Sequence, residues 1–446
     1  MPPTKLPHPV IVLPGILGTE LRDQYPVSAD TVWSALLNKD YDRITLHPRD
    51  LRYELTEPSR VTEGNPFDLP YGELIEELRH ELSPAKDRPV PVFPFGYDWR
   101  QPLLMTAHRL ASFVDEVIAR TSLLRHYVED GYADDPRVSL VGHSMGGLII
   151  AGYLALEGSA SKVHKVVSLG TPFRGSFEAV LKVATGTASI GPAPSSSRER
   201  EAARLTPSLY HLVPSFPGGV VPGAAGVKTD LFDPAAWQPG VAATLSEFIR
   251  QHAPDPPEAK KDLKKEARDL LRVLLDGARS FINGVERLDL GALGMKPSQW
   301  LAIIGVDSTT RVRLRIDPGP SFDLTSEDRA NAWGSKKAAE AELTGDGTVP
   351  FAGAVPTFLP RESLVCVRPA DFGYWEVADR AAVAVAGFHP ILPKLNLAHR
   401  LIASFLLDNR STKALPPARN GTWARGAPRV PRDAWSPPIA GLAWKD

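Results

Sequence analysis

One serine of this sequence stands in a setting that could make it a nucleophile. The pattern GHSMG at 142–146 follows a short apolar run at 138–141 and precedes a longer apolar run at 147–154. These runs predict a strand, a tight turn and a helix, which is the context that a G-x-S-x-G nucleophile requires. The glycines are needed because so tight a turn leaves no room for side chains beside a strained serine. Ser144 is therefore the predicted nucleophile.

Two further residues could complete a nucleophilic site. Asp346 lies between two glycines in a predicted tight turn and is suited to orient a histidine, although GDG is also a common plain turn. Asp307, directly after the predicted strand at 301–306, is the alternative acid. His389 precedes the predicted terminal helix, whereas His399 lies inside it, so His389 is the better candidate for the base.

The order of these residues along the chain is informative by itself. Ser144, Asp346 and His389 follow one another in the order found in α/β-hydrolases, which differs from the orders in chymotrypsin and subtilisin. In such a triad the imidazole takes the serine proton and returns it to the leaving group, while the carboxylate fixes the tautomer and stabilises the imidazolium. The order predicts nucleophilic catalysis at Ser144.

An oxyanion formed at this serine would need backbone N–H donors. Met145 follows the nucleophile at the predicted start of a helix, where N–H groups are free and the helix dipole is positive. A glycine-punctuated loop at 14–19 follows the predicted strand at 9–13 and can offer a second donor. Ile16 is the first choice for that donor and Leu17 the second. The alternative is an ordinary connection between a strand and the next element.

Alternating strands and helices must position these groups. Predicted strands at 9–13, 91–95, 138–141 and 163–169 alternate with helices, of which the segment 107–127 is strongly amphipathic. This alternation predicts an α/β fold with a doubly wound, mostly parallel sheet.

The alternation stops after residue 172. Loop clusters and one strong helix, predicted at 257–288, fill the segment 173–300 and predict an inserted cap over the C-terminal edge of the sheet. The predicted parts are a first core segment with the nucleophile (9–172), the cap or lid (173–300), a second core segment with the acid and histidine (301–410) and a Pro/Trp-rich tail (411–446).

Composition excludes several classes of function. The 446 residues carry 51 basic and 52 acidic side chains, a formal charge of -1, so no nucleic-acid footprint is present. Cys366 is the only cysteine, which excludes an internal disulfide and a thiolate metal cluster. We expect no metal and no cofactor. Because neither a signal peptide nor a transmembrane segment is visible, we expect a cytoplasmic protein.

Six motifs occur in an order typical of one family. They are VLPGILGT (12–19), YDWR (97–100), GHSMGG (142–147), GTPFRG (170–175), PSLYHLVP (207–214) and GDGTVP (345–350). Together they resemble the lecithin:cholesterol acyltransferase family, which includes lysosomal phospholipase A2 and phospholipid:diacylglycerol acyltransferases. The resemblance runs from about residue 9 to residue 406 and leaves out the tail. The individual motifs are moderately specific, and their shared order is much more so.

This resemblance has consequences for fold, site and substrate. It implies an α/β-hydrolase core with a cap and a mobile lid, and an acyl-enzyme on Ser144 with a lipid or other carboxylic ester as donor. The family's acid corresponds to Asp346 rather than Asp307. Its oxyanion donors correspond to Ile16 and Met145. Eukaryotic members are typically secreted or membrane-anchored with disulfides, whereas here we expect no signal peptide and Cys366 is the only cysteine.

These features predict a serine hydrolase of carboxylic esters, of the lipase, esterase or phospholipase type. Two alternatives remain at this point: an O-acyltransferase that passes the acyl group to an alcohol, and a non-catalytic binding protein with the same fold. The predicted partner is an ester or lipid substrate. A lipid substrate could be met at a membrane surface. Acyl chain length, head group and oligomeric state depend on the shape of the irregular cap, which sequence does not determine.

Overall fold

The computed structural model describes residues 5–34, 38–56, 58–187, 196–327, 344–360, 363–369 and 387–407. The predicted tail at 411–446 lies outside these residues, as does part of the segment 301–410.

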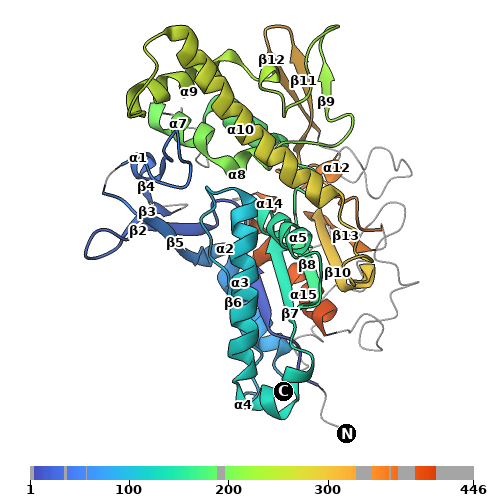
Figure 1. Cartoon of the computed structure of the whole chain (residues 1–446). Helices are drawn as coiled ribbons and strands as arrows, with labels where there is room; N and C mark the ends of the chain where they lie inside the picture. The colour runs from blue at the N-terminus through green and yellow to red at the C-terminus, as the bar shows by residue number, and fades with distance from the viewer. Residues whose placement is uncertain are drawn as a thin grey trace.

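A six-stranded parallel sheet forms the centre of the molecule (Figure 1). In spatial order its strands are β13 (Leu364–Val367), β10 (Trp300–Gly305), β8 (Val163–Leu169), β7 (Val138–His143), β1 (Val10–Leu13) and β6 (Val92–Pro94). All neighbouring pairs are parallel. The chain order reverses at β1, which lies between β6 and β7. Such a reversal opens a crevice at the carboxyl ends of the strands, where ligands bind in sheets of this kind.

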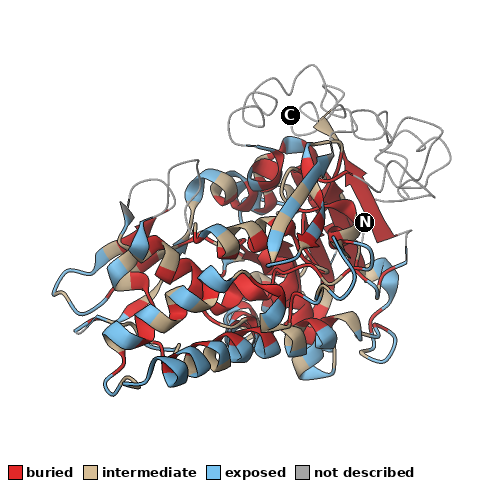
Figure 2. Ribbon diagram, turned by 90° about the horizontal axis from the view of Figure 1, so that it is seen from above, coloured by how far each residue is buried: buried red, intermediate tan, exposed pale blue. Residues whose placement is uncertain are grey.

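Both faces of the sheet are buried, because successive side chains of a strand point to opposite faces. Ile11 and Leu13 of β1 pack in one apolar cluster with α3 (Leu103–Ser122) and α5 (Met145–Glu157). Val10 and Val12 pack in a second cluster with α2 (Asp68–Leu82) and α15 (Asn396–Leu406). Buried residues therefore lie on both faces of the sheet (Figure 2). The predicted α/β fold with a doubly wound parallel sheet is confirmed.

A small antiparallel sheet follows β1 directly. Its strands, in spatial order, are β4 (Asn38–Lys39), β3 (Asp30–Ser34), β2 (Thr19–Asp23) and β5 (Val61–Pro66), with α1 (Tyr41–Ile44) beside them. Sequence reasoning found no clear pattern in this region. The strands are short and the register shifts twice, so no regular alternation of apolar residues marks them.

The cap lies over the carboxyl ends of the central strands and contains most of the helices of the middle of the chain (Figure 1). Its elements are α6 (Phe177–Thr185), α7 (Ser197–Leu205), α8 (Pro207–Tyr210), β9 (Val220–Pro222), α9 (Pro239–His252), α10 (Lys260–Glu286), β11 (Thr310–Asp317) and β12 (Ser321–Glu327). β11 pairs with both β9 and β12. Residues on both sides of position 300 thus contribute to the cap sheet.

The long helix α10 joins the cap to the core. Its first four turns place Leu263, Leu271 and Leu275 in the apolar cluster of the cap. Its last turns place Ile282 and Val285 in the core cluster, beside α5. The predicted amphipathic helix at 257–288 therefore packs on the cap interior with one half and on the core with the other.

Short elements complete the described chain. They are α4 (Arg125–Glu129), α12 (Phe351–Ala354) and α14 (Phe388–Ile391), with the 3₁₀ turns η1 (Tyr132–Asp134), η2 (Pro234–Ala236), η3 (Pro297–Gln299) and η7 (Leu392–Lys394). The predicted helix at 107–127 is divided into α3 and α4. The strand predicted around Cys366 is β13, and its thiol is buried.

Candidate active site

Ser144 occupies the turn between β7 and α5, next to the chain reversal of the central sheet. Its backbone has φ 52 and ψ -123, a conformation that L-residues rarely adopt and that costs about 1–3 kcal/mol. The glycines around it are required by contact. A Cβ on Gly142 would lie 2.6 Å from the Gly147 nitrogen, and one on Gly146 would lie 2.6 Å from the Leu13 oxygen. The turn therefore closes only with glycine at these positions.

The structure brings Ser144, His389 and Asp346 together in a row. His389 Nε2 lies 3.0 Å from Ser144 Oγ, and His389 Nδ1 lies 2.6 Å from Asp346 Oδ2. All three residues are buried. The tautomer follows if Asp346 is ionised: Nδ1 carries the proton and donates to the carboxylate, which leaves Nε2 free to accept the serine hydroxyl proton. This arrangement can activate a hydroxyl nucleophile.

Backbone groups hold Asp346 at the end of the row. Its Oδ1 accepts hydrogen bonds from the N–H groups of Thr348 (3.0 Å) and Val349 (2.7 Å). Its carbonyl oxygen accepts a bond from the N–H of His389 at 3.1 Å. The glycine-flanked turn predicted around Asp346 therefore fixes the carboxylate and also anchors the backbone of the histidine.

Two glycines let the loops of the acid and the base approach the sheet, and sequence reasoning did not single them out. Gly170 follows β8 with φ 53, and a Cβ there would lie 3.0 Å from Asp346 Oδ2 and 3.1 Å from His389 Nδ1. A Cβ on Gly305, at the end of β10, would lie 2.6 Å from the Asp346 Cβ. The signal available in sequence was the position of each glycine at the end of a predicted strand.

The loop after β1 passes directly against the serine. A Cβ on Gly15 would lie 3.0 Å from the Ser144 Cβ. The N–H of Gly18 bonds to the oxygen of Gly15 at 3.1 Å, which closes a turn over Ile16 and Leu17, and Leu17 has φ 62. Within the described residues, no acceptor is bound to the N–H of Ile16 or Leu17.

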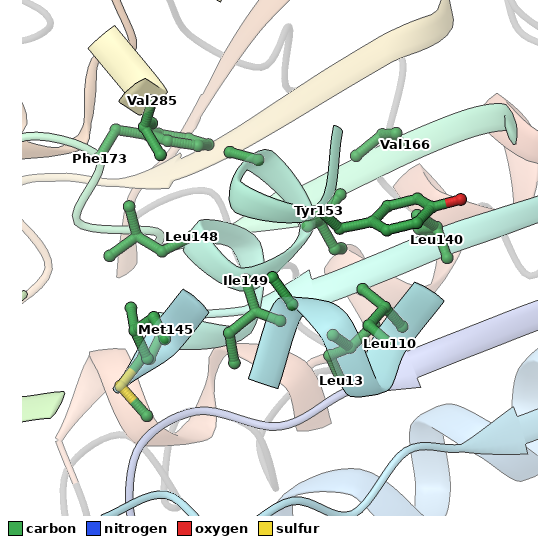
Figure 3. Packing of buried hydrophobic residues seen from close by; sticks show 14 of the residues in the cluster. Leu13, Leu110, Leu140, Met145, Leu148, Ile149, Tyr153, Val166, Phe173 and Val285 are labelled. Carbon is green, nitrogen blue, oxygen red and sulfur yellow. The ribbon is translucent and has the colours of Figure 1, made fainter. Parts of the chain in front are cut away.

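Met145 is the first residue of α5, so its N–H has no partner inside the helix. No described group outside the helix accepts a hydrogen bond from it either. The side chain of Met145 points into the core with Leu148 and Ile149 (Figure 3). The backbone N–H beside Ser144 is therefore held in place by a buried side chain.

The two rival residues face other partners. Asp307 follows β10 with φ 59, and its Oδ2 lies 3.9 Å from Arg368 Nε. His399 lies inside α15, and its Nε2 is 2.7 Å from the oxygen of Pro393. Burial lowers the pKa of His399 to about 4, although this hydrogen bond favours the charged form. Of the candidate acids and bases, Asp346 and His389 are the ones hydrogen-bonded in a row with Ser144.

The buried pair Asp98 and Arg100 forms a corner between three parts of the molecule. Arg100 bonds to both carboxylate oxygens of Asp98, at 2.9 and 2.8 Å. It also reaches the oxygen of Ile44 at 2.9 Å and Glu54 at 2.8 Å, next to the small sheet. The N–H of Ser208 in the cap bonds to the oxygen of Arg100 at 3.3 Å. A fully paired, buried guanidinium of this kind is a structural support.

A cavity of about 360 Å³ opens in the cap between the 214–220 loop and the end of α10. Arg279 and Glu286 contribute charged groups to its wall. No residue of the row Ser144, His389 and Asp346 lines it. The cavity is therefore a feature of the cap and is separate from the reactive groups.

No described helix combines the length and the apolar content that crossing a bilayer would take. Among the same residues, no group of three or more His, Cys, Asp or Glu side chains is arranged to hold a metal ion.

Comparison with known families agrees with the motifs. A family model described as lecithin:cholesterol acyltransferase matches residues 86–251, a segment that contains Ser144. The resemblance to this family is thereby confirmed over that segment. A search of curated proteins finds no match to this chain.

Several solved structures resemble the chain, including the following three. A chain of the crystal structure of the Tle4–Tli4 complex is 16% identical, with a TM-score of 0.58, and the match covers 91% of this chain and 99% of that one. Lipase BlEst2 of Bacillus licheniformis is 13% identical, with a TM-score of 0.32 and coverages of 82% and 85%. Phospholipase PlaB of Legionella pneumophila is 13% identical, with a TM-score of 0.29 and coverages of 72% and 51%. Only the first TM-score exceeds 0.5, and at 16% identity that likeness concerns the fold alone.

Proposed function

Because residues 86–251 match the lecithin:cholesterol acyltransferase family model, we propose that the chain is a serine hydrolase that cleaves carboxylic esters. Ser144, His389 and Asp346 are its catalytic residues in this proposal. The observation that carries it is the hydrogen-bonded row from Ser144 Oγ through His389 to Asp346, with distances of 3.0 and 2.6 Å. A strained serine at the switch point of the sheet supports the same conclusion, since such strain persists where function requires it.

The first half of the reaction forms an acyl-enzyme. Ser144 Oγ attacks the carbonyl carbon of the ester while His389 Nε2 takes the hydroxyl proton. The carbonyl oxygen becomes an oxyanion, which accepts hydrogen bonds from the N–H groups of Met145 and Ile16 in this proposal. When the tetrahedral intermediate collapses, the C–O bond to the leaving alcohol breaks and His389 gives that oxygen its proton. The acyl group stays on Ser144.

The second half repeats these steps with a new nucleophile. Water or an alcohol gives its proton to His389 Nε2 and attacks the acyl carbon, and Ser144 leaves with the proton that His389 returns. Water yields a carboxylic acid, whereas an alcohol yields a new ester. The same residues therefore serve a hydrolase and an O-acyltransferase, and the acceptor that reaches the acyl-enzyme decides between them.

Lipid esters are the proposed substrate class. The match to the family model supports this class, because lecithin:cholesterol acyltransferase is named for the transfer of an acyl group from a lipid. The position of the cap over the carboxyl ends of the strands supports a substrate that is largely enclosed during the reaction. A non-catalytic binding protein is the weaker alternative, since binding alone has no need of a strained serine bonded to a histidine.

A series of aryl esters from acetate to palmitate tests the proposal, with Ser144→Ala as the matched variant. We expect turnover by the natural chain and a loss of about 10⁴-fold or more in kcat for the alanine variant. The preferred acyl length then separates an esterase from a lipid-acting enzyme. Added long-chain alcohol that forms a new ester at the expense of free acid would identify transfer as the main activity.

A serine-reactive phosphonate provides the control for an unsuitable ester. If the natural chain turns over no ester but the phosphonate labels Ser144, the nucleophile is active and the substrate lies outside the series. Failure of both reactions would contradict the proposed function and favour the binding protein.

A further inference from the structure

Three buried hydrogen bonds run behind the serine from the loop after β1 to the backbone of His389. The Oη atom of Tyr71 lies 2.8 Å from the nitrogen of Gly15 and 2.8 Å from His143 Nδ1. His143 Nε2 lies 3.0 Å from the carbonyl oxygen of His389. Tyr71 and His143 are only 3% and 5% exposed, so water does not compete for these bonds.

The direction of every bond follows from the groups at the two ends. The N–H of Gly15 can only donate, and the carbonyl of His389 can only accept. His143 therefore carries its proton on Nε2 and accepts at Nδ1 from the Tyr71 hydroxyl, whose oxygen accepts from Gly15. Burial holds the pKa of His143 well below its ordinary value, which agrees with the neutral imidazole that this chain of bonds requires.

We propose that Tyr71 and His143 are positioning residues, which hold the loop of Ile16 and the backbone of His389 in register on either side of Ser144. This inference rests on the proposed function, in which Ile16 donates to the oxyanion and His389 is the base. Gly15 directly precedes Ile16, and its contact with Ser144 leaves the loop little freedom once Tyr71 is bonded. One tyrosine and one histidine thereby connect two parts of the site that come from opposite ends of the chain.

The hydrogen bond from Gly15 to Tyr71 can affect catalysis, because the reaction rate falls steeply when a catalytic group is displaced. A displacement of about 1 Å can lower a rate about 100-fold when it moves a donor away from the developing charge. A second tyrosine, Tyr97, holds the preceding residue of the loop through its bond to the oxygen of Pro14 at 2.8 Å. Loss of Tyr71 would therefore shift the loop locally without unfolding it.

Tyr71→Phe tests the positioning role, with Tyr127→Phe as the matched control. Tyr127 is also buried, and its hydroxyl bonds to the oxygen of Pro7 at 2.8 Å. It belongs to α4, which lies at the end of the molecule opposite the cap (Figure 1). Tyr71→Phe breaks two buried hydrogen bonds and Tyr127→Phe breaks one part-buried bond, so both should lower the Tm, Tyr71→Phe by more. We expect kcat to fall about 10- to 100-fold only in Tyr71→Phe, with KM within about threefold. Equal kcat in the two variants would overturn the proposal.

Two substitutions of His143 test its hydrogen bond to the backbone of His389. His143→Ala removes both bonds of the imidazole, whereas His143→Gln keeps an amide N–H that can reach the oxygen of His389. We expect the kcat of His143→Gln to exceed that of His143→Ala by at least about tenfold. If the two variants are equally impaired, the bond to His389 contributes no positioning and the proposal is wrong.

Hydrogen exchange keeps this inference separable from the proposed function. We expect faster exchange of the hydrogen-bonded amides of Gly15 and Gly18 in Tyr71→Phe than in Tyr127→Phe or the natural chain. This measurement needs no substrate, so it tests the positioning of the loop even if no ester is turned over. Unchanged exchange in Tyr71→Phe would overturn the positioning role, and an inert Ser144 with altered exchange would contradict the proposed function alone.

Discussion

Asp346 is engaged on both oxygens of its carboxylate. One oxygen accepts two backbone N–H groups, and the other faces His389 Nδ1 at 2.6 Å. Hydrogen bonds from fixed N–H groups hold the plane of this carboxylate in one orientation. The group can therefore hold the imidazole in one tautomer throughout a reaction, which is the role we propose for it.

Asp346→Asn should remove this control while keeping the shape of the side chain. An amide in place of the carboxylate favours the wrong imidazole tautomer, so we expect kcat toward a reactive aryl ester to fall about 10³- to 10⁴-fold. Asp307→Asn is the matched control, since the Asp307 side chain is only 6% exposed, against 1% for Asp346, and asparagine tolerates its positive φ. We expect its kcat to stay within about threefold of the natural value. The reverse order of effects would assign the acid to Asp307.

At the scale of elements, the packing of α10 on α5 connects the cap to the core. Gly152 of α5 meets the ring of Phe281 in α10, where a Cβ would lie 2.5 Å from the nearest ring atom. One turn further along α10, Val285 packs with Phe173 above α5 (Figure 3). The ring of Phe281 also contacts His211 of the cap at 5.2 Å between centroids. Displacement of the Phe281 ring would therefore disturb the packing of both the core and the cap.

A glycine-to-alanine substitution should therefore change the free energy of unfolding in opposite directions in the two helices. Gly152→Ala forces the Phe281 ring to move, and we expect the free energy of unfolding to fall by about 1–2 kcal/mol. A Cβ on Gly277, in the exposed face of α10, meets nothing within 4 Å. We expect Gly277→Ala to raise the free energy of unfolding by about 0.5–1 kcal/mol through helix propensity. Chemical denaturation measures both, and equal effects would mean that the helices do not pack as described.

At the scale of the whole molecule, buried neutral histidines make stability depend on pH. Burial lowers the pKa of His211 in the cap to about 4, although its hydrogen bond to the oxygen of Pro207 favours the charged form. Burial lowers the pKa of His399 in α15 to about 4 as well. In the unfolded chain both return to an ordinary pKa of about 6.5. Below pH 6.5 the unfolded chain thus binds protons that the folded chain does not.

Stability should consequently fall as the pH drops from 6.5 to 4, with no contribution from these groups above that window. We expect a loss of about 1 kcal/mol for each histidine at pH 5.5. The double variant with His211→Asn and His399→Gln keeps an amide donor at each site and removes the titration. Its unfolding free energy should change by about 2 kcal/mol less between pH 7.5 and 5.5 than that of the natural chain. His108→Asn, at an exposed histidine, is the control, and an unchanged pH slope in the double variant would contradict the account.

Local patterns predicted much of the architecture. The apolar runs around 10–13, 138–143 and 301–305 are strands of the central sheet, and the amphipathic segment at 257–288 is largely α10. The N-terminal sheet at 19–66 was not predicted, because short edge strands with register shifts have no regular period. The catalytic roles of the predicted site residues remain proposals, and the described structure brings Ser144, Asp346 and His389 into hydrogen-bond contact.

Sequence by itself determined the fold class and the order of nucleophile, acid and base, because strand and helix periods and the glycines of a tight turn are local properties. It left Asp346 and Asp307 as rivals until a family resemblance was considered, since Asp346 lies in a predicted glycine turn and Asp307 directly follows a predicted strand. Tertiary structure decided which carboxylate meets His389, because that contact joins residues 43 positions apart. It alone placed Tyr71 against His143, 72 positions away, since contacts at such separation depend on how the layers pack.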